Sequence, residues 1–334
     1  MYMRIGILTS GGDCSGLNSG IYEAYTRLED SGHEPVLIPD GFAGLQRAEN
    51  LVIDRDSLWM YAKQGGSILG SSRTKLQDPE PLNHALKGSR ELRLDGLVVF
   101  GGDGSLQGAA RLARAGLLTV GVPKTIDSDV GCTEETIGFY TAVQVGCESV
   151  ERIDDSRRSH RSAFLVEVMG RRSGFLAASI ARASGASGVL IPETPWSLNN
   201  LASRFAPLKG GLVVVSESAW SDDLGPARLA KNGKPIVGGV VEHIAKALTD
   251  IGVERVRTAT LGHALRGGAP TAADRLLARD LTAVAISGIF RNESGVAVKK
   301  EGQFLLAPSE AAFEPRRFMS DKDINLLSGI VVPA

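Results

Sequence analysis

Short apolar segments alternate with longer segments of helical periodicity along most of the chain. Apolar residues recur every three or four positions at about 17–28, 105–115 and 136–157, which predicts three helices. Short β-branched and aliphatic runs have the length and composition of buried strands; they lie at 5–8, 36–38, 96–100, 118–122, 163–168, 211–215 and 256–261. This alternation is typical of βαβ units, so we expect mainly parallel sheets covered by helices.

A polar cluster follows the end of six of these apolar runs. The clusters are rich in glycine, acidic residues and arginine or lysine, and they occupy 9–13, 101–105, 123–129, 169–171, 216–217 and 262–268. Open α/β sheets place their ligands at the carboxyl ends of parallel strands. Six clusters of compatible chemistry at such positions indicate an enzyme that handles phosphates.

Composition narrows the function further. A chain of 334 residues predicts two domains, and its net charge of −1 gives no sign of the basic character expected of a nucleic-acid-binding protein. No apolar stretch has the roughly 18 residues of a membrane span, and the first residues do not resemble a signal peptide. The three cysteines lack CxxC spacing, which favours a reducing compartment and hence a cytoplasmic location.

Two glycine pairs are candidates for phosphate binding. Gly11 and Gly12 follow the first predicted strand, and Gly101 and Gly102 follow the third. Glycines at a strand-to-helix turn let backbone N–H groups approach phosphate oxygens, and Asp103 beside the second pair suits Mg²⁺. Each pair alone is equally compatible with an ordinary turn.

Acids and cations follow the other strands. Asp127 and Asp129 lie two apart in one loop, where a carboxylate could accept a proton from a sugar hydroxyl, although an acidic surface turn explains them as well in isolation. Lys124 in the same loop could offset phosphate charge. Glu217 could accept hydrogen bonds from hydroxyls, and further cations that suit phosphate are Arg171, Arg257, His263 and Arg266.

Taken in order, six segments resemble 6-phosphofructokinases. They are 9–13, 69–73, 101–105, 123–127, 166–171 and 261–268, which together span nearly the whole chain. The resemblance implies an α/β protein of two Rossmann-like three-layer α/β/α domains with mainly parallel sheets and an active-site cleft between the domains. The implied nucleotide-binding domain is 1–138 plus about 265–312, and the sugar-phosphate-binding domain is 139–264 plus about 313–334. A homotetramer or homodimer is also implied.

The resemblance also implies a role for individual residues. Transfer of a phosphoryl group from ATP to fructose 6-phosphate would use Asp127 as base and Mg²⁺ on Asp103. The implied catalytic residues are Asp127, Arg73, Thr125 and Arg171. The implied donor-binding residues are Gly11, Arg73, Thr74, Gly102, Asp103, Gly104, Ser105 and Gly108. The implied sugar-phosphate-binding residues are Thr125, Asp127, Asp129, Met169, Gly170, Arg171, Glu217, Arg257, His263 and Arg266, with Arg257 supplied by a neighbouring subunit.

The donor is predicted from two positions. Gly104 is similar to ATP-using relatives, whereas Lys124 is similar to pyrophosphate-using ones, and this mixed pair resembles an actinobacterial-type ATP-dependent subgroup. In the pyrophosphate-using relatives that this loop resembles, a second aspartate stands at the position of Gly104. A carboxylate there would crowd and repel the α-phosphate of a nucleotide, whereas glycine leaves room, so we expect ATP.

The chain departs from the family pattern mainly on the acceptor side. Ser162 stands where the family has an arginine that reaches the neighbouring subunit's sugar phosphate, and Ser128 and Leu265 are lesser departures. Arg161 is adjacent, but neighbours on a strand point to opposite faces, so we expect that it cannot substitute. An arginine restored at 162 should tighten fructose 6-phosphate binding. A true phosphofructokinase and a kinase for another sugar or sugar phosphate both stay open.

Two further expectations concern regulation and alternative classes. Tyr22, Thr26 and Asp154 replace arginines that bind effectors in regulated bacterial relatives, so neither activation by ADP nor inhibition by phosphoenolpyruvate is expected. A catalytically silent nucleotide-binding relative is disfavoured because Asp103, Asp127 and Arg73 are all present. A sugar-nucleotide oxidoreductase fits poorly because residues 11–16 lack the G-x-G-x-x-G spacing.

Overall fold

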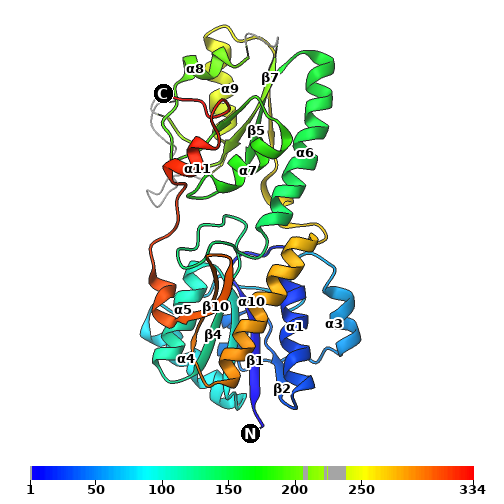
Figure 1. The fold of residues 1–334 in the computed structure, drawn as a ribbon, viewed down its shortest axis with the longest axis vertical. Helices are drawn as coiled ribbons and strands as arrows, with labels where there is room; N and C mark the ends of the chain where they lie inside the picture. The colour runs from blue at the N-terminus through cyan, green and yellow to red at the C-terminus, as the bar shows by residue number, and fades with distance from the viewer. Residues whose placement is uncertain (1, 206–209, 222–223, 225–237) are drawn as a thin grey trace. The chain divides into compact units, whose positions relative to one another are not determined.

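The computed structural model describes residues 2–205, 210–221, 224 and 238–334. The chain divides into two compact units, each built from segments distant in sequence. Unit 1 contains residues 1–141 and 266–316, and unit 2 contains residues 142–265 and 317–334. Figure 1 shows the elements of each unit along the chain.

Unit 1 is built on a six-stranded sheet in the order β10-β9-β4-β3-β1-β2, in which only β10 is antiparallel to its neighbour. The strands are β1 (Arg4–Ser10), β2 (Glu34–Leu37), β3 (Gly96–Gly101), β4 (Leu118–Pro123), β9 (Gly295–Lys300) and β10 (Gln303–Pro308). β1, β3 and β4 are adjacent and parallel, with Ser10 paired with Gly101 and Gly101 with Pro123. Their carboxyl ends, and the loops that follow, therefore lie side by side.

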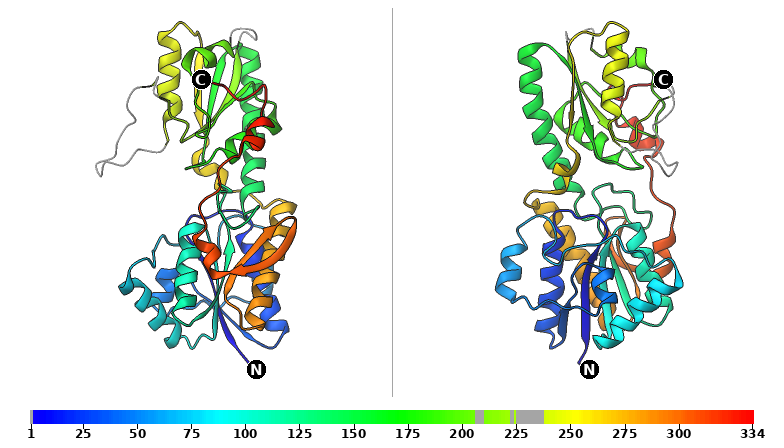
Figure 2. Two further views of the ribbon diagram at one scale, coloured as in Figure 1. Left: turned by 60° about the vertical axis from the view of Figure 1, so that its left-hand side comes forward. Right: turned by 180° about the vertical axis from the view of Figure 1, so that it is seen from behind.

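Helices cover both faces of this sheet (Figure 2). They are α1 (Leu17–Asp30), α2 (Phe42–Gln46), α3 (Arg55–Tyr61), α4 (Pro79–Glu91), α5 (Asp103–Arg114) and α10 (Ala272–Phe290), with a 3-10 helix η3 (Ser309–Phe313). On one face Leu8, Leu97 and Val99 pack with α2, α4 and α5. On the other, Phe100 lies against Gly20 of α1, where a Cβ atom would be 2.6 Å from the ring. The alternation along β3 thus separates two apolar layers.

Unit 2 contains a four-stranded, all-parallel sheet in the order β6-β7-β5-β8. Its strands are β5 (Ala163–Val168), β6 (Gly188–Leu190), β7 (Gly211–Ser216) and β8 (Val256–Thr260). Its helices are α6 (Phe139–His160), which begins in unit 1, α7 (Phe175–Ser184), α8 (Leu198–Ser203), α9 (Val240–Asp250), α11 (Asp321–Asn325) and the 3-10 helix η2 (Gly262–Arg266). Leu165, Val213 and Ile244 lie in a core between the sheet and α8 and α9.

The buried carboxylate of Glu167 helps to hold α9 against this sheet. It accepts hydrogen bonds from the N–H groups of Gly239 (2.9 Å), Val240 (2.8 Å) and Val241 (3.3 Å) at the start of the helix. An anion at a helix N-terminus satisfies N–H groups that have no partner within the helix. Glu167 is therefore a structural residue, although it lies in a segment that carries the family resemblance.

The predicted α/β class with mainly parallel sheets is confirmed. Every strand expected from the apolar runs is present within a few residues, and the long helix begins at Phe139, three residues later than predicted. The sequence pattern did not predict the β9–β10 hairpin, β6, or the helices α2 to α4 and α7 to α11. Among the described residues, no helix is both long and apolar enough to cross a membrane.

Candidate active site

The first glycine loop is joined to the segment that carries Arg73. The N–H of Gly11 donates to the carbonyl of Ser72 (2.8 Å), and the Ser71 hydroxyl donates to the carbonyl of Gly11 (2.7 Å). Gly11 has φ 94°, a conformation that glycine adopts without strain. Arg73 is exposed beside this loop, and the Ser72 hydroxyl donates to that of Thr74 (3.2 Å). Two segments about 60 residues apart thus form one edge of a candidate donor site.

The second glycine loop leads directly into α5. Gly102 precedes the helix and Asp103 is its first residue, where the partial positive charge of the N-terminus favours a carboxylate. The buried Ser105 hydroxyl donates to Ser10 at the end of β1 (3.0 Å), which ties the second loop to the first. A Cβ atom built on Gly104 would have no atom within 4 Å, so the space beside this residue is open.

Gly108, also expected to bind the donor, is buried one turn further along α5. A Cβ atom there would lie 3.0 Å from the ring of Phe42 in α2. Gly108 therefore lies where α5 packs against α2, and any larger side chain at this position would disturb that packing.

The third loop follows β4 and carries the candidate base. The N–H of Asp127 donates to the Thr125 hydroxyl (3.2 Å), and the Thr125 carbonyl accepts from the Thr136 hydroxyl (2.7 Å). Ser128 adopts φ 52° between the two acids. Asp127 is half-buried, whereas Asp129 is buried. Hydrogen bonds that involve the Thr125 and Thr136 side chains thus hold the loop in a defined conformation.

Lys124 connects the third loop to the first. Its side chain is buried, and Nζ donates to the carbonyl of Gly12. Burial lowers the pKa of Lys124 to about 8, and the nearby positive charge of Arg266 acts in the same direction. The lysine therefore stabilises the glycine loop through this hydrogen bond, whereas burial of its positive charge is unfavourable.

Arg266 also lies against the first loop. Its Nη1 donates to the carbonyl of Asp13 (2.9 Å), and a Cβ atom on Gly12 would lie 2.7 Å from Nη1. Arg257 on β8 and His263 in η2 are both exposed.

In unit 2, the loops after β5 and β7 are joined at Gly170. Its N–H donates to Glu217 Oε1 (3.3 Å), and the Ser218 hydroxyl donates to its carbonyl (2.7 Å). Gly170 has φ 145°, and a Cβ atom there would lie 2.9 Å from the carbonyl oxygen of Ser173. Met169 is half-buried and Arg171 is exposed in the same loop. Four residues expected to bind the sugar thus come from two adjacent strand ends.

The prediction for Arg161 and Ser162 requires a correction. The prediction treated residues 161 and 162 as strand neighbours, but β5 begins at Ala163 and Arg161 lies in a turn with φ 50°. Ser162 is 1% exposed, and its hydroxyl has no hydrogen-bond partner among the described residues. Arg161 is turned to the surface by its backbone conformation, not by strand alternation.

Arg316 is a site residue that the sequence analysis missed. Its Nε forms an ion pair with Asp103 Oδ2 (2.7 Å), and its Nη1 pairs with Asp129. It follows η3, roughly 190 residues after Asp129 and more than 200 after Asp103, in a segment without a glycine loop or recognisable motif. No signal in the sequence pointed to it, because only the tertiary fold brings it to the loops.

The donor set is compatible with Mg²⁺. Among the described residues there is no cluster of three or more His, Cys, Asp or Glu side chains that could enclose a metal ion. Mg²⁺ usually keeps several waters and is held by one or two carboxylates together with substrate phosphates. Asp103, next to the open space at Gly104, fits that kind of site.

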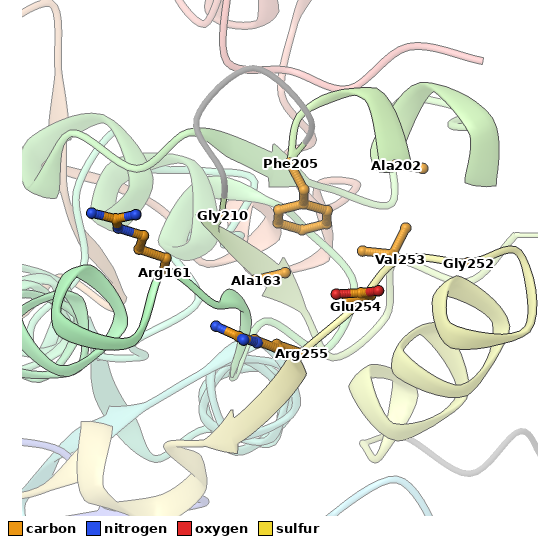
Figure 3. A pocket seen from close by; sticks show the side chains of 9 residues that line it. All are labelled: Arg161, Ala163, Ala202, Phe205, Gly210, Gly252, Val253, Glu254 and Arg255. Atoms are coloured by element: carbon orange, nitrogen blue, oxygen red, sulfur yellow. The ribbon is translucent and has the colours of Figure 1, made fainter.

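A separate pocket of about 470 Å³ lies in unit 2 (Figure 3). It is lined by Arg161, Phe205, Glu254 and Arg255, among others, at the amino ends of β5 and β8. The candidate residues of unit 2 instead follow the carboxyl ends of its strands. This pocket is therefore distinct from the predicted substrate loops.

Comparisons with known proteins identify the family that the chain resembles. Residues 4–289 match the model of the family described as phosphofructokinase. The chain is 38% identical over 307 residues to ATP-dependent 6-phosphofructokinase 3 of Streptomyces coelicolor, covering 88% of this chain and 89% of that protein. It is also 35% identical over 316 residues to a pyrophosphate–fructose 6-phosphate 1-phosphotransferase of Dictyoglomus thermophilum, covering 91% of each.

Solved structures show the same fold. A phosphofructokinase from Saccharomyces cerevisiae has a TM-score of 0.79 at 27% identity, over 93% of this chain and 45% of the yeast chain. The present chain thus spans less than half the length of that relative. A pyrophosphate-dependent phosphofructokinase from Marinobacter aquaeolei has a TM-score of 0.83 at 18% identity, which shows a common fold.

Proposed function

The chain belongs to the phosphofructokinase family, and on that basis we propose that it transfers the γ-phosphoryl group of ATP to the 1-hydroxyl of fructose 6-phosphate. The products are fructose 1,6-bisphosphate and ADP. The observation that carries the proposal is the meeting of three loops at the ends of β1, β3 and β4, joined by Ser105–Ser10 and Lys124–Gly12 hydrogen bonds. Glycines, a carboxylate at a helix N-terminus and a candidate base are thereby gathered at one sheet edge.

ATP is proposed as the donor because of Gly104. Relatives named for ATP and relatives named for pyrophosphate have similar identities to this chain, so family membership alone does not choose between them. The open space beside Gly104 supports a donor that extends past the β-phosphate. An aspartate at this position would place a negative charge beside the α-phosphate.

In the proposed mechanism, Asp127 accepts the proton of the sugar 1-hydroxyl as its oxygen forms a bond to the γ-phosphorus. The bond from that phosphorus to the β–γ bridging oxygen breaks, and ADP leaves. Asp103, together with the phosphates, would hold Mg²⁺, which would neutralise part of the negative charge of the donor. Arg73, exposed beside the first loop, offsets negative charge on the moving phosphoryl group.

The acceptor is proposed to bind the loops of unit 2 that meet at Gly170. Glu217 accepts hydrogen bonds from sugar hydroxyls, and Met169 and Arg171 also contact the sugar. Thr125, which belongs to unit 1, is assigned to the sugar as well. Arg257, His263 and Arg266 bind the 6-phosphate, with Arg257 contributed by a second copy of the chain. A homotetramer or homodimer is accordingly part of the proposal, as is a cytoplasmic location.

A second acceptor is favoured by one observation, the burial of Ser162. Ser162 is buried and its side chain carries no charge, so it does not reproduce the family arginine that reaches the neighbouring sugar phosphate. Loss of one charged hydrogen bond, worth about 1.5–3 kcal/mol, would weaken fructose 6-phosphate binding by roughly ten- to a hundredfold. A different ketose phosphate or an unphosphorylated sugar is therefore the alternative substrate.

The test is ADP release from Mg-ATP with a panel of acceptors: fructose 6-phosphate, sedoheptulose 7-phosphate, tagatose 6-phosphate and unphosphorylated sugars. Efficient turnover of fructose 6-phosphate supports the first proposal, and preference for another acceptor supports the second. Turnover with pyrophosphate but none with ATP would refute the assigned donor.

A variant pair tests the assigned base. Asp127→Ala should lower turnover by several orders of magnitude, whereas Asp250→Ala, at the exposed end of α9, should leave it unchanged. Equal activity of the two variants would overturn the role of Asp127.

A further inference from the structure

Arg316 bridges two carboxylates of the candidate site. Its guanidinium group bonds Asp103 through Nε at 2.7 Å and Asp129 through Nη1. The Asp103 and Asp129 side chains are 13% and 4% exposed, and that of Arg316 is 33% exposed. One cation therefore faces two largely buried anions, which differs from the usual exposed surface ion pair.

The backbone before Arg316 is fixed to the same helix that carries Asp103. The ring of Phe313 at the end of η3 lies 5.3 Å from the guanidinium carbon of Arg111 and 4.5 Å from that of Arg114, both on α5. The carbonyl of Pro315 packs so closely against Gly131 that a Cβ atom there would overlap it. Packing of the residues just before Arg316 thus helps to direct its side chain to Asp103.

This geometry has a consequence for metal binding. A guanidinium bonded to Asp103 occupies one carboxylate oxygen and repels a second cation. A metal ion approaching Asp103 without a nucleotide meets a carboxylate whose charge is already compensated. Nucleotide phosphates bring additional negative charge and oxygen ligands, so they change this balance in favour of the metal.

We propose that Arg316 is a positioning residue that acts as the resident cation of the donor site, so that a divalent metal binds well only together with the nucleotide. The inference rests on the proposed function in one respect, the assignment of Asp103 as the metal-binding carboxylate. It adds a role for a residue in the segment where the chain passes from unit 1 to unit 2.

The test is a Mn²⁺ titration of the nucleotide-free protein, followed by electron paramagnetic resonance. Arg316→Gln should bind Mn²⁺ about tenfold more tightly than the original protein, because a positive charge next to the ion is removed. Arg316→Lys keeps the charge and should bind Mn²⁺ nearly as weakly as the original. Arg291→Gln is the matched control, since it removes an exposed arginine from an ion pair elsewhere and should change nothing.

A second readout is the coupling between metal and nucleotide. The ratio of Mn²⁺ affinities with and without ADP should shrink by a similar factor in Arg316→Gln. A purely structural role predicts weaker or unchanged Mn²⁺ binding in a folded variant, and that result would overturn the proposal.

Removal of Arg316 leaves Asp129 buried without this partner, which could prevent folding. The same comparison is then made in an Asp129→Asn background, where Arg316→Gln should again tighten Mn²⁺ binding relative to Asp129→Asn alone. Equal or weaker binding there also overturns the proposal.

These titrations need no turnover, so the two proposals can fail separately. Tighter Mn²⁺ binding without ATP-dependent turnover would support the role of Arg316 and reject the proposed function. Turnover of fructose 6-phosphate with unchanged Mn²⁺ affinity would support the proposed function and reject the role of Arg316.

Discussion

Burial of Lys124 should make the stability of the protein depend on pH in the alkaline range. Its pKa is lowered from 10.5 to about 8, chiefly because burial disfavours the charged amine. The unfolded chain therefore binds more protons than the folded one between these values, and stability rises with pH across that window. Below pH 8 the amine is charged in both states, and its desolvation opposes folding in full.

The size of the effect follows from the shift. Lowering the pKa from 10.5 to about 8 corresponds to about 3 kcal/mol, of which about 2–3 kcal/mol should be recovered between pH 7 and pH 10. Lys124→Met removes the titrating group at nearly constant length. At pH 7 the variant loses the hydrogen bond to Gly12 but also the cost of the buried charge, so its stability should be close to that of the original protein.

The assay is urea unfolding, followed by circular dichroism, at pH 7, 8, 9 and 10. The original protein should become more stable than Lys124→Met by about 2–3 kcal/mol at pH 10. Lys246→Met, which alters an exposed lysine on α9, controls for the general effect of removing an amine. A stability difference between the original and Lys124→Met that stays constant with pH would refute the reasoning.

Three other predictions concern donor choice, packing and regulation. Gly104→Asp should lower kcat/KM for ATP by about tenfold or more while sparing any activity with pyrophosphate, because only the nucleotide meets the new charge; an equal loss with both donors would point to a damaged loop. Ser162→Ala should raise the free energy of unfolding by about 1 kcal/mol, since it removes a buried hydroxyl whose partner is lacking among the described residues, and a lower melting temperature would contradict this. Neither ADP nor phosphoenolpyruvate should shift the sugar-phosphate saturation curve, because Tyr22 packs on an aromatic ring and Asp154 is paired with a neighbouring arginine; a shift with either ligand would count against it.

The strands and glycine loops could be predicted from sequence because both depend on local patterns. A buried strand needs a continuous apolar run, and a tight turn at its end needs residues that tolerate special backbone angles. Gly11 and Gly170 show positive φ values at such ends. The order of strands within each sheet carries no local signal, and neither do the helices whose apolar stripe is short, such as α2 and α3.

The amino-acid sequence by itself determined the fold class, the family and the composition of the three loops that follow β1, β3 and β4. Only the tertiary structure decided that Arg316 faces Asp103 and Asp129, that Lys124 is buried beneath Gly12, and that the Ser162 side chain points into the protein. These features depend on contacts between residues that lie from tens to more than two hundred positions apart in the sequence. Charge compensation and desolvation arise from what surrounds a side chain in space, and neighbours in sequence do not specify those surroundings.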